Sequence, residues 1–325
     1  MMAEACLRLD GVPDPSLKTD MTPVLRSSGH LSADRRYDYA RGAASEGDHA
    51  AAADLLLQTL EIVPSWAPAW FALGEAREEM GAREEAAQAF AQALAHDPQD
   101  SQGARLRLAR LGAAAQPDQP PQAYVRDLFD QYAARFESHL VKDLGYCAPA
   151  VLRDAIMRAN DAARRFCVVL DLGCGTGLMA RAMADLCDTI DGVDLAPAMA
   201  AKARASGFYR HVEAGDLIDF LNAREAHSVD LVVAADVFVY CGNLDAIFAQ
   251  ARRVCAPQAL FAFTLQRGEG AGYALGDDLR YAHAPAYIAR LASAHGFHLL
   301  FCEEVSVRQD RGKPVPGLSV VLTAP

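Results

Sequence analysis

The sequence predicts an α/β protein in which a doubly wound sheet follows a small all-helical region. Two observations support this prediction. Residues 166–323 alternate between short apolar runs typical of buried strands and segments with helical spacing, the order that a doubly wound sheet requires. Before them, Pro64 and Pro98 stand 34 residues apart, as do Ala52 and Ala86, which indicates an internal helical repeat.

The first strand of the sheet runs directly into a glycine-rich turn. Phe166–Leu172 is apolar and β-branched, and Gly173, Gly175 and Gly177 then allow a sharp turn and close approach to a ligand. A dinucleotide-binding turn would have its third glycine where Leu178 stands. Asp171 would repel a pyrophosphate, whereas it suits a ligand with a positive charge, such as an α-ammonium group.

This strand and turn resemble the first motif of the class I S-adenosylmethionine (SAM) dependent methyltransferases. The resemblance implies a Rossmann-like sheet of seven strands with the last strand antiparallel, and it implies SAM as cofactor, with S-adenosylhomocysteine as product and no metal. The cofactor contacts that it implies at the turn are Asp171, Gly173, Cys174, Gly175 and Gly177.

Further cofactor contacts are expected after the next two strands. Asp194 ends the second strand, where a carboxylate can accept two hydrogen bonds from a ribose diol. Leu195 and Met199 resemble residues that pack near adenine, although Met199 fits plain core equally well. Asp216 would accept from the adenine amino group beside the Leu217 amide; a surface turn is the alternative.

The acceptor side is expected beyond the fourth and fifth strands. Asp236 and Tyr240 follow the fourth strand, where ligands of such sheets bind. The stretch between Gln266 and Ala286 reads as a loop, and its Arg280-Tyr281-Ala-His283 run is similar to one in bacterial tetratricopeptide-repeat methyltransferases. This similarity makes His283 a candidate catalytic group and makes Arg280 and Tyr281 candidate substrate contacts. Tyr240 is a second catalytic candidate because of its position after the fourth strand. A purely structural histidine at the start of a helix is the alternative.

A helix with aromatic residues on one face precedes the first strand. Phe129, Tyr132 and Phe136 recur at helical spacing, which core packing alone could explain. The run F-D-x-Y-A-x-x-F-x-x-H-L, to Leu140, resembles the opening of the same bacterial methyltransferases. The resemblance implies a lid in which Tyr132 faces SAM or the substrate, Tyr124 helps to close the site, and Phe129 and Phe136 contact the substrate.

The domain division follows from composition. We expect a flexible leader at 1–32, a helical domain at 33–112, a proline-containing linker at 113–121 and a SAM domain at 122–325. In the helical domain, Trp70, Gly74, Ala86 and Pro98 resemble a tetratricopeptide repeat, with a degenerate first unit and a capping third helix. This domain would offer a groove for a peptide or a protein, or else serve as a packing platform.

Composition and charge exclude several classes of protein. The net charge of −11 leaves no basic stripe for nucleic acid, and no long apolar run suggests a membrane partner. The eight cysteines show no metal-binding spacing and indicate a reducing, cytoplasmic location. A homo-oligomer is compatible with the sequence.

Three functions remain open at this point. The protein would transfer a methyl group from SAM to a small molecule, methylate a protein or peptide that its helical region recruits, or bind SAM without catalysis. The sequence does not identify the acceptor or the atom that is methylated.

Overall fold

The computed structural model describes residues 27–137, 145–160, 164–310 and 312–325. The chain divides into two compact units. One contains the described residues up to Leu128 together with Leu275–Arg280, and the other contains Phe129–Ala274 and Tyr281–Pro325. The predicted leader, apart from its last six residues, and Leu140 of the predicted lid lie outside the described residues.

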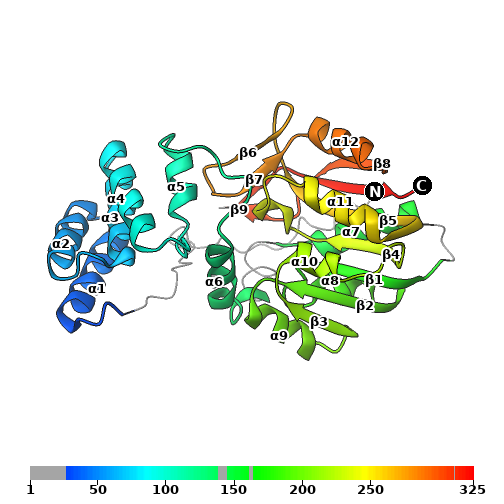
Figure 1. The fold of residues 1–325 in the computed structure, drawn as a ribbon, viewed down its shortest axis with the longest axis horizontal. Coiled ribbons are helices and arrows are strands. Elements are labelled where there is room, and N and C mark those ends of the chain that lie inside the picture. Colours follow the sequence, from blue (N-terminus) through cyan, green and yellow to red (C-terminus); the bar gives the residue numbers. More distant parts are fainter. Residues whose placement is uncertain (1–26, 138–144, 161–163, 311) are drawn as a thin grey trace. The chain divides into compact units, whose positions relative to one another are not determined.

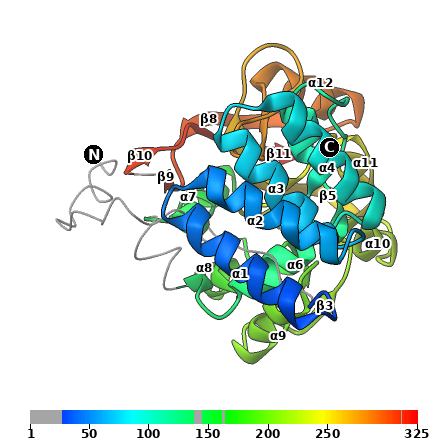
Figure 2. The ribbon, with the colours of Figure 1, turned by 90° about the vertical axis from the view of Figure 1, so that its left-hand side faces the viewer.

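The first unit is all-helical in its N-terminal part, as predicted. Helices α1 to α4 lie side by side in chain order (Figure 2). The helices of this unit are α1 (Leu31–Ser45), α2 (His49–Ile62), α3 (Ala67–Glu79), α4 (Arg83–His96) and α5 (Ala104–Arg110).

Close helix packing at Gly74 explains the repeat signature. A Cβ at Gly74 of α3 would lie 2.6 Å from the Phe90 ring of α4, so only glycine allows this approach. Ala86 is fully buried beside it, and Phe71 meets Phe90 with ring centroids 5.2 Å apart. In the degenerate first unit, Tyr37 packs on Trp66 with centroids 4.9 Å apart. Gly74 therefore allows α3 and α4 to cross closely, as helices of such a repeat do.

The second unit is built on a mixed sheet. Its strands follow the order β3-β2-β1-β4-β5-β11-β8, with β11 antiparallel to both of its neighbours (Figure 1). The predicted sheet of seven strands with an antiparallel last strand is therefore confirmed. These strands are β1 (Phe166–Leu172), β2 (Cys187–Asp194), β3 (His211–Ala214), β4 (Val229–Ala234), β5 (Cys255–Arg267), β8 (His298–Val305) and β11 (Gly317–Thr323).

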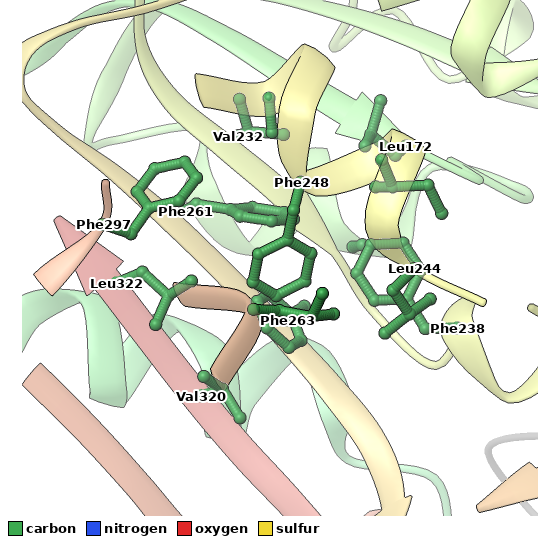
Figure 3. Close-up of a cluster of buried hydrophobic side chains, with 14 of the residues drawn as sticks. Leu172, Val232, Phe238, Leu244, Phe248, Phe261, Phe263, Phe297, Val320 and Leu322 are labelled. Carbon is green, nitrogen blue, oxygen red and sulfur yellow. The ribbon is translucent and has the colours of Figure 1, made fainter. Parts of the chain in front are cut away.

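Helices cover both faces of this sheet because its central strands are apolar on both sides. Buried side chains of α7 and α8 pack on one face, and those of α10, α11 and α12 pack on the other. The second face holds a phenylalanine-rich core that includes Phe238, Phe248, Phe261 and Phe263 (Figure 3). The helices are α7 (Ala148–Ala159), α8 (Leu178–Met183), α9 (Pro197–Ala205), α10 (Leu217–Asn222), α11 (Asp245–Val254) and α12 (Pro285–Ala294).

One stretch expected to be a loop contains strands. The segment between Gln266 and Ala286 holds β6 (Tyr273–Leu275) and β7 (Tyr281–His283), and β7 extends the sheet by pairing with the end of β5. The prediction of a simple loop there was wrong, since the run lacks the apolar alternation of a strand. Between β8 and β11 the chain forms a small hairpin of β9 (Gln309–Asp310) and β10 (Lys313–Pro314).

The division between the units falls later in the chain than the expected domain start at residue 122. Helix α6 (Gln122–Tyr132) crosses the division, and Leu275–Arg280 belongs to the helical unit. Two hydrogen bonds hold that segment there: the Leu275 amide donates to Gln116 Oε1 at 2.7 Å, and the Arg110 guanidinium donates to the Asp277 carbonyl at 2.9 Å. No helix in the described ranges combines the length and the apolar character needed to cross a bilayer.

Two mid-helix glycines of the helical unit allow a matched test of its packing. We expect Gly74→Ala to lower the free energy of unfolding of this unit by about 1–3 kcal/mol, because the new methyl group overlaps the Phe90 ring. Gly42→Ala, whose Cβ meets nothing within 4 Å, should instead stabilise α1 by up to about 1 kcal/mol. Urea unfolding followed by tryptophan fluorescence reports on this unit, because both tryptophans, Trp66 and Trp70, belong to it.

Candidate SAM-binding site

The glycine turn after β1 has a left-handed backbone that only glycine adopts readily. Gly173, Gly175 and Gly177 have φ values of +66°, +54° and +97°. At Gly173 there is a second restriction, since a Cβ there would lie 2.5 Å from the Val237 side chain. The turn therefore packs directly on the segment that leaves β4, and both segments lie at the carboxyl ends of the parallel strands, where ligands of such sheets bind.

The carboxylate of Asp194 at the end of β2 is held by two backbone amides. Oδ2 accepts from the Gly175 amide at 2.8 Å, and Oδ1 accepts from the Ala196 amide at 2.9 Å. Burial raises the pKa of Asp194 to about 6 in spite of these two bonds. Each oxygen of a carboxylate can accept more than one hydrogen bond, so this fixed group can still receive a diol.

Asp171, at the end of β1, is buried together with Tyr209. The Tyr209 hydroxyl donates to Asp171 Oδ2 at 2.6 Å. Burial raises the pKa of Asp171 to about 7, the hydrogen bond from Tyr209 opposes the rise, and the nearby Asp194 adds to it. Tyr209 was not predicted from the sequence. The one available signal was Gly192, where a Cβ would lie 2.8 Å from the Tyr209 ring, so glycine there makes room for it.

An aromatic cluster from the end of α6 lies beside the glycine turn. The Phe129 ring contacts Tyr240 edge-on with centroids 5.1 Å apart, and Tyr132 contacts Phe136 at 5.3 Å. A Cβ at Gly175 would lie 3.8 Å from the Phe136 ring, so this ring covers the turn. Asp130, which was not predicted, fixes this segment by accepting from the Ala198 amide in the first turn of α9 at 2.8 Å.

The two predicted adenine contacts after β2 differ in burial. Met199 is fully buried in one cluster with Tyr132 and Ala196, which favours the alternative of a core residue, while Leu195 is half-buried. Cys174 is also buried, and burial raises the pKa of its thiol. An ionised, reactive Cys174 is therefore not expected.

Asp216 caps helix α10. Its Oδ1 accepts from the Ile218 amide at 2.7 Å and from the Asp219 amide at 3.3 Å. Leu217 is the first residue of the helix, and its side chain is half-buried. The cap explains why aspartate precedes this helix, and it fixes the carboxylate at the carboxyl end of β3, where the predicted adenine contact would need it.

Asp236 leaves β4 in a left-handed conformation, with φ +59°, which is uncommon for a residue other than glycine. Its amide donates to Thr264 Oγ1 at 2.8 Å, and its carboxylate forms an ion pair with Arg308. Arg308, which is 3% exposed, also donates to Gln266 Oε1 at 2.8 Å. Neither Arg308 nor Gln266 was predicted, because no spacing relates them to Asp236.

Tyr146, another residue that was not predicted, lies near both Asp236 and Asp171. Its hydroxyl donates to the Ala235 carbonyl at 3.4 Å. Its pKa lies well above the usual value because of burial and because Asp236 and Asp171 are close. The phenol therefore stays protonated and lies near both the carboxylate at the glycine turn and that of the β4 exit.

Four candidate residues make contacts that their predicted roles do not involve. The Tyr124 ring lies against Gly103 in the helical unit, to which Arg280 also belongs. Tyr281 and His283 are fully buried, and His283 Nε2 lies 3.0 Å from the Gly242 carbonyl. Burial lowers the pKa of His283 to about 4. These contacts favour the structural alternative for His283, and they provide no support for the substrate roles of the other three.

Metal ligands were not expected from the sequence. Within the described ranges, no group of three or more histidine, cysteine, aspartate and glutamate side chains gathers in a way that could hold a metal ion.

The fold and these groups define an α/β domain with three acidic side chains, Asp171, Asp194 and Asp236, at the carboxyl ends of its parallel strands. Residues 170–263 match the family model described as a methyltransferase domain, and residues 67–100 match that of the tetratricopeptide repeat. The chain therefore contains a class I SAM-dependent methyltransferase domain with a tetratricopeptide repeat on its N-terminal side.

Curated relatives match only part of the chain. A malonyl-[acyl-carrier protein] O-methyltransferase of Geobacter sulfurreducens is 41% identical over 102 residues, which are 30% of this chain and 38% of that protein. A ubiquinone biosynthesis O-methyltransferase of Xanthomonas oryzae pv. oryzae is 32% identical over 103 residues, which are 30% of this chain and 43% of that protein. The chain thus spans less than half the length of these relatives.

Solved structures show a weaker likeness. The 1,6-didemethyltoxoflavin-N1-methyltransferase of Burkholderia thailandensis aligns with a TM-score of 0.49 and 16% identity, over 65% of this chain and 93% of that one. The [4+2]-cyclase SpnF aligns with a TM-score of 0.48 and 16% identity, over 62% and 96% of the two chains. Likenesses of this size carry no argument about function.

The hydrogen bond between Tyr209 and Asp171 allows a test of how the Asp171 carboxyl group ionises. Tyr209→Phe removes a hydrogen bond that stabilises the charged carboxylate, so we expect the pKa of Asp171 to rise further above 7. Carbon NMR of labelled aspartate carboxyl groups, with the Asp171 signal assigned through Asp171→Asn, measures this pKa. Tyr39→Phe, at an exposed tyrosine, is the control and should leave it unchanged. An unchanged or lower pKa in Tyr209→Phe would contradict the arrangement.

Proposed function

We propose that this protein transfers a methyl group from SAM to a small-molecule acceptor. One observation carries the proposal: the buried carboxylate of Asp171 and the half-buried carboxylate of Asp194 lie at the ends of adjacent parallel strands, and the Gly175 amide donates to Asp194 directly. Withdrawing acidic groups from water is unfavourable unless a partner compensates them, and it raises the pKa of both. A ligand with an ammonium group, a sulfonium and a ribose diol, but no phosphate, suits this pair.

The residues that would bind SAM, the methyl donor, form two groups, one for its methionine end and one for its adenosine end. Asp171 would accept from the ammonium group, and Asp194 would accept from the two ribose hydroxyls. Asp216 and the Leu217 amide would meet the adenine ring at the carboxyl end of β3. Gly173, Gly175 and Gly177 supply close backbone approach, while Tyr132 and Phe136 would cover the cofactor from the α6 side.

The acceptor would bind between Asp236, Tyr240 and Phe129. Bound SAM would supply a methyl group on its sulfonium: the acceptor would form a bond to the methyl carbon in line with the breaking C–S bond, and S-adenosylhomocysteine would leave. The tasks of the protein are then to align the nucleophile and to exclude water, and good alignment contributes on the order of 7–11 kcal/mol in favourable cases. The edge-on rings of Phe129 and Tyr240 would exclude water, and Asp236, held by Arg308, would orient an acceptor that donates a hydrogen bond.

The relatives support a small-molecule acceptor, because their names describe O-methylation of malonyl-[acyl-carrier protein] and O-methylation in ubiquinone biosynthesis. The tetratricopeptide repeat favours a second candidate, a methyltransferase whose helical unit recruits a protein or peptide. A SAM-binding protein without catalysis is the third. A cytoplasmic location remains our prediction from the sequence.

The pH dependence of SAM binding tests the role of Asp171. Only the ionised carboxylate attracts the ammonium group, and its pKa is about 7, so affinity should rise nearly tenfold per pH unit well below pH 7 and then level off. Asp171→Asn should weaken binding by about 10–100-fold, as loss of a hydrogen bond between charged groups does, and should remove the part of the pH dependence that is centred near pH 7. Calorimetric titration from pH 5.5 to 7.5 measures both effects.

The matched control for this titration is Asp154→Asn on the exposed face of α7, which should bind SAM as the wild type does. A wild-type affinity that does not change with pH, or an Asp171→Asn variant that keeps full affinity, would refute the assignment of Asp171.

A labelling experiment separates the three candidate functions. Wild-type protein and methyl-labelled SAM are incubated with a cell extract, which is then divided by ultrafiltration into small molecules and macromolecules. We expect protein-dependent label among the small molecules and none above background with Asp194→Ala. Label among proteins or peptides would favour recruitment by the helical unit, and SAM binding without label transfer to any fraction would contradict the proposed activity.

A further inference from the structure

The segment that presents Tyr240 is fixed at both ends in the core of the sheet. Phe238 and Leu244 are fully buried in the phenylalanine-rich cluster (Figure 3). Phe238 begins a short turn of 3₁₀ helix, η2 (Phe238–Tyr240), and residues 241–244 then lead into α11. We refer to Phe238–Leu244 as the presenting loop, because it carries the Tyr240 ring to Phe129.

Two side chains from a distant part of the chain hold the middle of the presenting loop. His283 Nε2 lies 3.0 Å from the Gly242 carbonyl. The Tyr287 hydroxyl accepts from the Leu244 amide at 2.9 Å and donates to Asn243 Oδ1 at 3.4 Å. Gly242, Asn243 and Leu244, three consecutive residues of the loop, thus contact one side chain of β7 and one of α12.

The position of His283 is itself fixed by backbone bonds and ring contacts. β7 pairs with the end of β5, and the Gly268 amide donates to the His283 carbonyl at 2.9 Å. Its imidazole stacks on Tyr287 with centroids 5.8 Å apart, and it contacts Tyr273 at 6.0 Å. A rigid strand end and two tyrosine rings therefore set the direction of its Nε2 atom.

The protonation state of His283 follows from its partner. A carbonyl oxygen only accepts hydrogen bonds, so Nε2 carries the proton, and in a neutral ring Nδ1 is then a bare acceptor. Nδ1 is buried and has no hydrogen-bond partner among the described residues. Burial lowers the pKa of the ring to about 4, so it stays neutral at physiological pH. A ring that is fully buried, with one nitrogen bound to the backbone, is not placed to take a proton from an acceptor.

We propose that His283 and Tyr287 are positioning residues that hold the presenting loop so that Tyr240 faces Phe129 and the acceptor. The statement that Tyr240 faces an acceptor rests on the proposed function; the hold on the loop does not. The role of His283 is thus mechanical, because it donates one hydrogen bond to the loop backbone and supplies a flat surface for Tyr287.

Three variants test the hold on the loop. His283→Leu removes the donor to Gly242, and Tyr287→Phe removes the acceptor for the Leu244 amide while keeping the aromatic surface. His283→Gln is the conservative control, since its amide nitrogen corresponds in reach to Nε2 and can still donate to Gly242. Hydrogen exchange of the protein without any ligand reports on the loop, so this result does not depend on whether SAM binds.

We expect amide exchange over residues 241–244 to accelerate at least tenfold in His283→Leu and in Tyr287→Phe, with β1 and β4 unchanged. His283→Gln should restore most of the protection. In fluorotyrosine-labelled protein, the Tyr240 signal, assigned through Tyr240→Phe, should shift in His283→Leu and return toward the wild-type position in His283→Gln. Nitrogen NMR should show a neutral His283 ring with its proton on Nε2 from pH 5 to 8.

Three results would overturn the proposal. The first is wild-type protection of residues 241–244 in both His283→Leu and Tyr287→Phe. The second is acceleration throughout the sheet, which would show general loosening of the fold. The third is a His283 ring that gains a proton near pH 6, as an accessible general base would. Failure of SAM to bind would refute the proposed function but would leave these measurements of the loop unaffected.

Discussion

The bonds between the Asp194 carboxylate and two backbone amides fix the relative positions of two strand ends. One bond reaches the Gly175 amide in the turn after β1, and the other reaches the Ala196 amide just before α9. The glycine turn can lie this close to Asp194 because its backbone is left-handed. Gly173 has no Cβ, so the Val237 side chain can fill the space that a Cβ would occupy. The exits of β1, β2 and β4 are therefore set by one small group of contacts.

The electrostatics of the site follow from this packing. Asp171, Asp194 and Asp236 are brought to one edge of the sheet, and burial raises the pKa of the first two. Among the described residues, Asp236 is matched by the buried Arg308, whereas Asp171 accepts a hydrogen bond from the neutral phenol of Tyr209. The donor side is thus short of positive charge, whereas the acceptor side carries its own counter-ion. A cationic donor beside a polar, neutral acceptor would fit this difference in charge.

Those parts of the molecule whose chemistry is local could be predicted from the sequence. Apolar strands are recognisable by their composition, and the glycines of the turn and of the α3–α4 crossing are required by backbone geometry or packing at their own positions. Tyr209, Arg308, Tyr146 and Asp130 could not be predicted, because each reaches the site from a separate element through tertiary packing. The role of His283 could not be predicted for the same reason. Its residue type suggested a catalytic group, whereas its burial at the end of β7 and its contact with the Gly242 carbonyl favour a positioning role.

A crystal structure of the protein with S-adenosylhomocysteine tests the central claim most directly, because this product keeps the ammonium group and the ribose diol. We predict that both ribose hydroxyls lie within hydrogen-bond distance of Asp194, and that the ammonium nitrogen lies within hydrogen-bond distance of Asp171. The adenine ring should lie beside Asp216. A ligand bound elsewhere, or one turned so that neither carboxylate contacts it, would contradict the claim that these two carboxylates bind the methyl donor.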